Sequence, residues 1–339
     1  MAEFYDLPPE RIAQEPPKKR GASRLLVVDR ATGELADRRY TDLIDYLHAG
    51  DVLVLNTTKV LPARLKAKLP DGRQRELMLT ERHAHTLPSG QAQVVYRGKL
   101  RVGDKLTIGQ HELRVAQIID GGQAIVSSPQ PLEAIAIEYG ATPLPPYIRR
   151  AASRADRERY QTVFAANTGS VAAPTASLNL TEELLEKIHA KGVKVVSLTL
   201  HVGRGTFLPI RTDDVAAHKM HEEYYDIPVA TGHEIQQAKL EGRRVVAVGT
   251  TVTRALEYAA QDIQQAITQN LTGEADIFIH PGYKFKLVDV LLTNFHAPDS
   301  TVIQLAAAFT GQDLLLLSYR HALKGEYRFL SYGDSMLIV

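Results

Sequence analysis

The chain contains no cysteine among its 339 residues, and its formal charge at pH 7 is only +1. The lack of cysteine excludes disulfides, thiolate nucleophiles, cysteine-ligated zinc and the iron–sulfur clusters of radical enzymes. The small net charge excludes attraction of nucleic acid by a uniformly positive surface, because counterion release needs clustered lysines and arginines. A polyanionic partner would therefore have to meet a local basic cluster.

Long hydrophobic runs are also lacking. The longest apolar stretches are strand-sized, and the N-terminal MAEFYD has neither the basic start nor the apolar core of an export signal. We therefore expect a cytoplasmic protein without membrane contact. With 44% hydrophobic and 23% charged residues, the composition is that of a soluble globular protein, and its length suits about two domains.

Two basic clusters stand out against the balanced charge. The first is Lys18-Lys19-Arg20, which follows two prolines. The second consists of Arg149, Arg150, Arg154, Arg157 and Arg159. From the residues alone, each is either a nucleic-acid contact or a solvated loop face.

The spacing of hydrophobic residues along the chain changes near residue 65. Before it, residues 24–29 and 52–55 are predicted strands, and a helix is predicted at about 41–47. From Leu65 to about Ser128, short strands alternate with turn signals, of which Asp120-Gly121-Gly122 is the strongest. The predicted strands are residues 76–79, 92–96, 105–108, 113–119 and 124–126. We expect a small all-β barrel domain inserted over residues 65–146.

After residue 146 strands and helices alternate, a pattern typical of helices that cover a largely parallel sheet. We therefore expect a large mixed α/β domain from residues 1–64 and 147–339. Thr181 is a predicted helix N-cap, and residues 195–200 are a predicted strand. Strand 245–248 leads through Gly249-Thr250-Thr251 into a helix at about 253–261, whose free N–H groups suit a carboxylate or phosphate. An ordinary capped turn is the alternative interpretation.

Several familiar ligand motifs are missing. No Gly-x-Gly-x-x-Gly lies between a strand and a helix, and no P-loop is present, so the sequence supports neither a dinucleotide fold nor a P-loop nucleotide site. His218 and His221 lie three residues apart, beside Glu222 and Glu223. This spacing is compatible with a metal site, but a solvated helix end is the more common outcome, and we predict no metal.

Three segments join small residues, glycines and a histidine in what look like loop edges of a cleft: YQTVF at 160–164, GSVAAPTA at 169–176 and LHVGRGTF at 200–207. They resemble the signature of the S-adenosylmethionine:tRNA ribosyltransferase-isomerases of queuosine synthesis. Further similar blocks lie at residues 4–8, 50–64, 143–148, 218–223, 281–285, 291–296 and 327–334. Blocks like those of the family therefore cover nearly the whole chain.

The resemblance implies a specific reaction. The ribosyl moiety of S-adenosylmethionine is transferred and isomerised onto 7-aminomethyl-7-deazaguanine at the tRNA wobble position, which gives epoxyqueuosine and releases adenine and methionine. The implied partners are tRNA and S-adenosylmethionine, the latter as co-substrate, with no metal or other cofactor. We expect a monomer.

This reaction needs a base beside the sulfonium, a proton donor for adenine and a neutral amine. We predict that His201 and His296 are catalytic, because each ends a β-like run at a probable cleft edge. The predicted substrate-binding residues are Asn56, Thr58, Arg64, Thr175, Asn179, Gly203, Gly205, Thr250, Thr251, Arg254 and Asn294. Arg64 and Arg254 have fold-stabilising ion pairs as their alternative.

The chain departs from the family pattern at a few positions. Ser177, Asn179 and Leu180 stand where the family usually has glycine, histidine and phenylalanine, and Asp299 stands where lysine is common. An asparagine amide cannot transfer a proton at neutral pH. A diverged paralogue is therefore the alternative: it would bind S-adenosylmethionine or tRNA but lack this activity, or use another acceptor.

Overall fold

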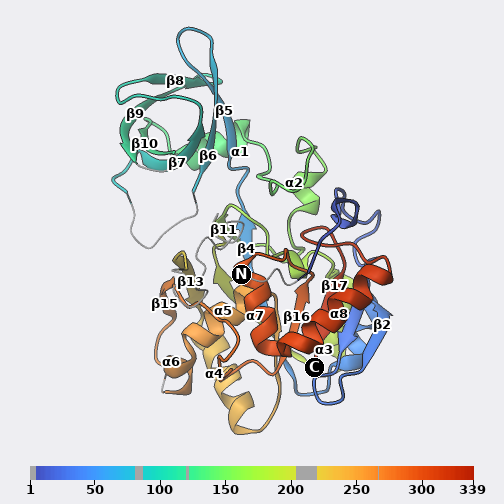
Figure 1. The fold of residues 1–339 in the computed structure, drawn as a ribbon. Coiled ribbons are helices and arrows are strands. Elements are labelled where there is room, and N and C mark those ends of the chain that lie inside the picture. The colour runs from blue at the N-terminus through green and yellow to red at the C-terminus, as the bar shows by residue number, and fades with distance from the viewer. Residues whose placement is uncertain (1–4, 81–86, 120–121, 204–219, 266) are drawn as a thin grey trace.

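The structure is a computed structural model that describes residues 5–80, 87–119, 122–203, 220–265 and 267–339. A nine-stranded mixed sheet forms the centre of its larger part (Figure 1). In spatial order the strands are β15 (Leu271–Ala275), β13 (Glu223–Ile227), β12 (Lys194–Leu200), β3 (Val52–Asn56), β14 (Val245–Val248), β16 (Val290–Asn294), β17 (Ser335–Ile338), β1 (Arg24–Val28) and β2 (Leu35–Arg39).

The expectation of a largely parallel sheet holds only at the centre. Strands β12, β3, β14 and β16 are parallel, and β17 is parallel to β1. The last strand, β17, pairs antiparallel with β16, and β13, β15 and β2 add antiparallel edges. The alternation of strands and helices along the chain predicts strands that pair in parallel. It does not predict which further strands pair antiparallel with them at the edges of the sheet.

Helices cover both faces of this sheet. The helices on one face are α4 (Val229–Leu240), α5 (Thr250–Tyr258), α6 (Ala260–Gln264), α7 (Thr301–Thr310) and α8 (Gln312–Lys324). The other face packs against the 3-10 helix η2 (Tyr40–Tyr46), the start of η3 (Thr175–Ser177) and α3 (Glu182–Ala190). Alternate strand residues supply the two cores: Val52 and Val54 face the first, and Leu53 and Leu55 the second.

The predicted helix boundaries differ in detail from those observed. The segment predicted as a helix at 41–47 is the 3-10 helix η2, and α5 begins at Thr250 rather than near Thr253. The Thr181 cap is confirmed, because its Oγ1 accepts a hydrogen bond from the Leu184 N–H at 3.1 Å.

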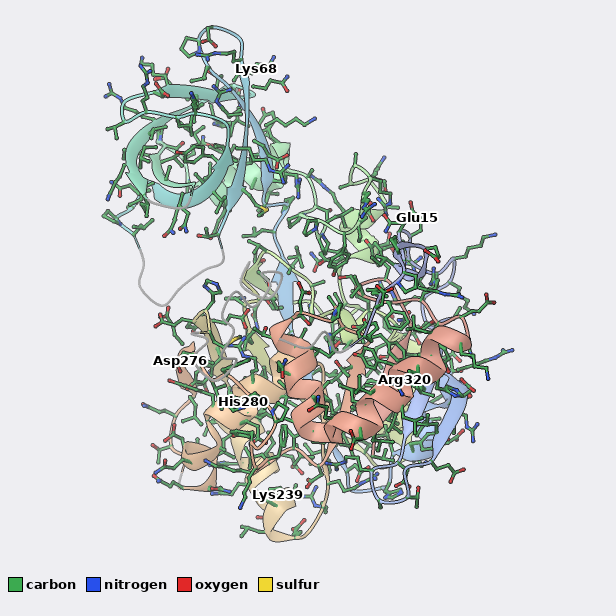
Figure 2. All side chains as sticks on the ribbon, in the orientation of Figure 1. Glu15, Lys68, Lys239, Asp276, His280 and Arg320 are labelled. Carbon is green, nitrogen blue, oxygen red and sulfur yellow. The ribbon has the colours of Figure 1, made fainter. Side chains whose placement is uncertain are left out.

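A closed six-stranded β-barrel projects from this α/β part (Figure 1). Around the barrel the strands are β10 (Gln123–Ser127), β7 (Gln91–Arg97), β6 (Gln74–Leu79), β5 (Arg64–Lys68), β8 (Lys105–Ile108) and β9 (His111–Ile119). Side chains fill its interior (Figure 2), and helix α1 (Leu132–Tyr139) packs against the same core. The expected fold class, mixed α/β with a small barrel, is confirmed.

Short elements surround the base of the barrel. Strands β4 (Thr58–Val60) and β11 (Asn167–Ser170) form a parallel pair, helix α2 (Asp156–Arg159) follows the barrel, and η1 (Pro9–Arg11) lies near the N-terminus. The predicted turn at 120–122 falls largely outside the described residues, but β9 and β10 on either side of it pair antiparallel. Within the described ranges, no single helix is long and apolar enough to cross a membrane, and α7 with α8 reaches that length only with a bend of 112°.

Candidate active site

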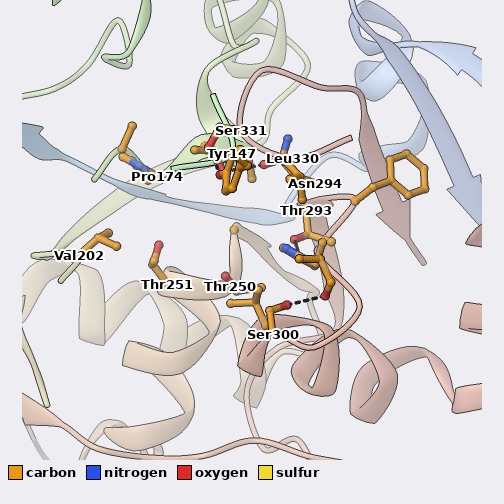
Figure 3. Close-up of a pocket in the computed structure, with 18 of the residues that line it drawn as sticks. Tyr147, Pro174, Val202, Thr250, Thr251, Thr293, Asn294, Ser300, Leu330 and Ser331 are labelled. Atoms are coloured by element: carbon orange, nitrogen blue, oxygen red, sulfur yellow. Dashed lines mark hydrogen bonds between the residues drawn. The ribbon is translucent and has the colours of Figure 1, made fainter. Parts of the chain in front are cut away.

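A cavity of about 260 Å³ opens at the carboxyl ends of the central strands, the edge where open α/β sheets bind ligands (Figure 3). Its walls come from the segments after β12, β14 and β16 and from η3 with the residues just before it. Tyr147 and the segment of Leu330 and Ser331 complete the walls. The lining residues are Tyr147, Ala173, Pro174, Thr175, Ala176, Val202, Gly249, Thr250, Thr251, Thr293, Asn294, Phe295, His296, Ala297, Asp299, Ser300, Val302, Leu330 and Ser331.

The start of helix α5 forms one side of the cavity. Gly249, its N-cap, has φ of 98°, a backbone conformation that favours glycine. The first turn of an α-helix leaves N–H groups without intrahelical partners, and here Thr250 and Thr251 add hydroxyls. This side of the cavity therefore offers donors to an anionic group, and the predicted binding residues Thr250 and Thr251 lie in it.

Asn56, at the end of β3, lies behind this helix start. Its Nδ2 donates to the Leu200 carbonyl at 3.0 Å and to Thr251 Oγ1 at 3.3 Å. Its Oδ1 accepts from the N–H groups of Leu200 and Thr58, both at 3.0 Å. Asn56 thus joins the ends of two strands and orients Thr251, without lining the cavity itself.

Thr175 and Asn294 are far apart in the sequence but are joined by a hydrogen bond. Thr175 Oγ1 donates to Asn294 Oδ1 at 2.9 Å, and Asn294 Nδ2 reaches the Asp334 carbonyl at 3.4 Å. Both residues line the cavity, as expected from the sequence. The contact couples η3 to the end of β16.

His296 lies in the cavity wall, two residues beyond β16. Its Nε2 is 2.8 Å from Thr293 Oγ1, and its backbone N–H donates to the Tyr319 hydroxyl at 2.9 Å. The Tyr5 hydroxyl donates to its carbonyl. Burial lowers the pKa of His296 to about 3. The imidazole is therefore neutral at physiological pH and needs no deprotonation before it accepts a proton.

His201, the other predicted catalytic residue, lies beside the cavity rather than in its wall. Its Nδ1 is 2.8 Å from Thr58 Oγ1, and its ring stacks on Tyr224 at a centroid distance of 5.6 Å. The ring is covered by Gly169, where an added Cβ would lie 2.6 Å from Nε2. The side chain is 4% exposed, and the next residue, Val202, reaches the cavity.

A second polar cluster follows β12. Arg254 forms a buried ion pair with Glu223, and its Nη2 also donates to the carbonyls of Ala275 at 3.1 Å and His221 at 3.3 Å. The Gly203 N–H donates to Glu223 Oε1 at 3.0 Å. The guanidinium of Arg254 is thus turned toward Glu223, and neither Arg254 nor Gly203 lines the cavity.

The other predicted binding residues are dispersed. Arg64 lies in β5, where Nη1 is 3.4 Å from Glu76 and Nη2 is 3.3 Å from the Leu144 carbonyl. Asn179 is buried but does not line the cavity, and Gly205 lies outside the described residues, as does His218. Among the residues that the structure describes, no group of three or more His, Asp or Glu side chains is placed to hold a metal ion.

The unusual residues near Asn179 also lie away from the cavity wall. Ser177 is fully buried, and Leu180 belongs to the apolar core that η2 and α3 share. None of the three departures from the family pattern at Ser177, Asn179 and Leu180 therefore lies in the cavity wall. Asp299, in contrast, lines the cavity and places a carboxylate there.

Sequence reasoning did not select Tyr147, Thr293, Ser300 or Ser331, all of which line the cavity. The Tyr147 hydroxyl lies 2.6 Å from Ser331 Oγ, and burial raises the pKa of Tyr147 to about 12. Figure 3 shows this pair across the cavity from Thr250 and Thr251. The signal was available, because Tyr147 and Ser331 fall inside blocks that resemble the family.

A sequence model of a family described as "Queuosine biosynthesis protein" matches residues 2–338. The chain belongs to the queuosine biosynthesis protein family. Similar family members include the S-adenosylmethionine:tRNA ribosyltransferase-isomerases of Chlorobaculum parvum, 55% identical over 98% of both chains, and of Thermotoga maritima, 45% identical over 100% of this chain and 99% of the other. A crystal structure of S-adenosylmethionine tRNA ribosyltransferase from Thermotoga maritima is 37% identical over 100% of both chains, with a TM-score of 0.57. The resemblance seen in the sequence is confirmed.

Proposed function

We propose that this protein transfers and isomerises the ribosyl moiety of S-adenosylmethionine onto 7-aminomethyl-7-deazaguanine in tRNA, at the wobble position, to give epoxyqueuosine, adenine and methionine. The observation that carries the proposal is 55% identity over 98% of both chains to a relative named for this transfer. Several blocks that carry the family resemblance also form the cavity wall, which supports placing the chemistry there.

The cavity offers groups that match the parts of S-adenosylmethionine. We assign the methionine carboxylate to the first turn of α5, where N–H groups and the hydroxyls of Thr250 and Thr251 are donors. Asp299 provides the complementary negative charge for the ammonium or sulfonium group. Thr175 and Asn294 supply further hydrogen-bonding groups to orient the ligand.

We assign the proton transfer to His296. A sulfonium makes the neighbouring C–H acidic, and a neutral imidazole can take that proton directly. Because burial lowers the pKa of His296 to about 3, the imidazolium is unstable and readily returns a proton, which the departing adenine requires. The proton removed beside the sulfonium is delivered to adenine, and methionine leaves with the electron pair of the C–S bond. The amine releases one proton to solvent as its new C–N bond forms, which balances the lost positive charge of the sulfonium. His201 acts as a positioning residue beside the cavity, held by Thr58.

The test mixes the purified protein with S-adenosylmethionine and a tRNA that carries the aminomethyl base, and then measures free adenine and the nucleoside mass. Adenine release that depends on this tRNA, together with the mass of the epoxycyclopentane adduct, is the expected result. A tRNA with guanine at the wobble position is the substrate control. If S-adenosylmethionine binds but neither product forms, the diverged-paralogue alternative replaces this proposal.

We also propose that the protein acts as a monomer in the cytoplasm, where its tRNA substrate resides. The exposed large apolar side chains of the described residues support the monomer, because they are scattered over several elements: Val102, Ile137, Tyr139, Leu240, Tyr258 and Leu317.

A further inference from the structure

The two basic clusters of the sequence form one surface. Residues 14–20, near the N-terminus, lie against residues 149–159, which include α2, and we call the two segments together the basic face. Figures 1 and 2 show the N-terminal segment, marked by Glu15, beside α2. Although more than 120 residues separate the segments in sequence, several arginines join them.

Arg150 is the main connection between the segments. Its guanidinium pairs with Asp156 at 2.7 Å and with Glu15 at 2.6 Å, and its Nε donates to the Gln14 carbonyl at 3.0 Å. Arg159 donates to the Pro17 carbonyl at 2.7 Å. In the opposite direction, Arg20 donates to the Glu158 carbonyl at 3.2 Å. The basic face is therefore a built surface rather than two independent loops.

These contacts leave most of the positive charge uncompensated. The two segments carry eight cationic and three anionic side chains, a net charge of +5, whereas the whole chain carries +1. Two of the three carboxylates, Glu15 and Asp156, are occupied by Arg150, and the third, Glu158, is exposed. Carbonyl partners, such as those of Arg20 and Arg159, orient a guanidinium without neutralising it.

Five cations of the basic face are exposed and make no ion pair within the described ranges: Lys18, Lys19, Arg149, Arg154 and Arg157, the last of which donates to the carbonyls of Ile137 and Gly140. Lys19 and Arg20 also line a hollow together with Arg24, Arg39 and Glu183, so that four cations face one carboxylate there. Such an excess of cations suits phosphate oxygens.

Hydrogen bonds connect the basic face to the wall of the cavity. Gln14 Nε2 donates to the carbonyl of Tyr147, a cavity-lining residue, at 3.0 Å, and Gln14 Oε1 accepts from the Arg149 N–H at 2.8 Å. Arg328, three residues before the cavity residue Ser331, donates to the Glu15 carbonyl at 3.3 Å. A polyanion bound along this face would lead directly to the cavity.

We propose that the basic face binds the phosphate backbone of tRNA and so positions the wobble base over the cavity. The inference rests on the proposed function for the identity of the nucleic acid. The face itself is distinguished by its positive charge and by its hydrogen bonds to the cavity wall. Because phosphate contacts carry no sequence information, this surface supplies affinity and register, and the cavity supplies recognition of the modified base.

The test compares wild type with the variant Lys18→Ala/Lys19→Ala/Arg149→Ala/Arg154→Ala. Binding of a tRNA transcript, without S-adenosylmethionine, is measured by fluorescence anisotropy at several salt concentrations. The variant Lys194→Ala/Lys324→Ala is the control, because both lysines are exposed and lie outside the basic face. These six side chains are all exposed, so folding should be preserved, which circular dichroism checks.

Each phosphate contact contributes roughly 0.9 to the slope of log affinity against log salt, so the quadruple variant should lose about 3.6 from that slope and bind at least about tenfold more weakly at ~0.1 M salt. The control should bind like wild type. Equal slopes and affinities for the quadruple variant and wild type would overturn the proposal. Failure of the proposed function can be told apart from failure of this proposal. If the proposed function is wrong, the wild-type protein still binds tRNA through this face but releases no adenine.

Discussion

His296 and His201 are both histidines at strand ends, but they lie in different surroundings, and we propose different tasks for them. His296 faces the cavity with a hydroxyl partner, whereas His201 is enclosed by Thr58, Tyr224 and the backbone of Gly169. A ring so enclosed orients its neighbours, and a ring in a cavity wall can meet a substrate. The sequence offered the same pattern for both, since a histidine that follows a strand does not reveal what covers it.

The lowered pKa of His296 predicts a specific pH dependence of stability. Below a pH of about 6.5 the unfolded chain binds a proton at this histidine, but the folded protein does not until the pH approaches about 3. The free energy of unfolding should therefore decrease as the pH falls through this window, by at most about 1.4 kcal/mol per pH unit from this group. His296→Gln removes the effect, so wild type should lose stability relative to the variant between pH 6 and pH 4.

Urea unfolding of both proteins across this pH range measures the difference. His189→Gln, on the exposed end of α3, is the matched control because its side chain lies in solvent. Parallel pH profiles for wild type and His296→Gln would show that the imidazole is free to ionise in the folded protein. In that case burial does not lower the pKa of His296, and the ready return of its proton to adenine would need another cause.

At the scale of elements, α5 has two separate tasks. Its first turn lines the cavity, and Arg254, one turn further along, anchors the helix to β13 through Glu223 and to β15 through the Ala275 carbonyl. The ion pair is almost fully buried, so neither charge has water as an alternative partner. This geometry favours the structural interpretation of Arg254 over contact with the substrate carboxylate.

Glu223→Gln should therefore destabilise the protein by about 3–5 kcal/mol, because it leaves the Arg254 charge buried without its partner. At a temperature where the variant remains folded, the KM for S-adenosylmethionine should change less than about twofold, since a group outside the cavity adds no ligand contact. Lys239→Met, which breaks the half-exposed pair with Asp289, is the control and should cost less than about 1 kcal/mol. If Glu223→Gln instead greatly increased the KM for S-adenosylmethionine without loss of stability, Arg254 would contact the substrate.

The sequence predicted elements well where the signal was local. Five of the six barrel strands, the Thr181 cap and the strand–glycine–helix unit at Gly249 follow from short-range patterns, and the structure contains them. The sixth barrel strand, β5, was not predicted. Features that depend on distant partners were not predictable. The hydrogen bond between Tyr147 and Ser331 joins residues 184 apart, and β17 returns beside β16 without any local mark. The side-chain direction of Arg254 depends likewise on Glu223, 31 residues away.

At the scale of the whole molecule, the chain combines a sheet that carries the cavity with a barrel that has its own core. Arg64 at the start of β5 pairs with Ala141, so the chain enters and leaves the barrel side by side. β5 begins at Arg64, one residue before the predicted domain boundary, and the boundaries at 65 and 146 stay a prediction. Such paired ends are typical of inserted domains. When an inserted domain is removed, the two ends of the remaining chain lie close enough to be joined by a short linker.

We predict that residues 62–142 fold alone. The fragment contains all six barrel strands and α1, and its closed sheet leaves no unpaired edge. Its core side chains, such as Leu77, Val94 and Leu106, are fully buried, and a domain of this size should have a stability of about 3 kcal/mol.

Cooperative urea unfolding and dispersed amide resonances are the expected results, with Leu77→Asp as a control fragment that does not fold. Leu61 and Val171 lie outside the fragment but in the same core, so an unfolded wild-type fragment would mean that the barrel depends on the larger part for its closure.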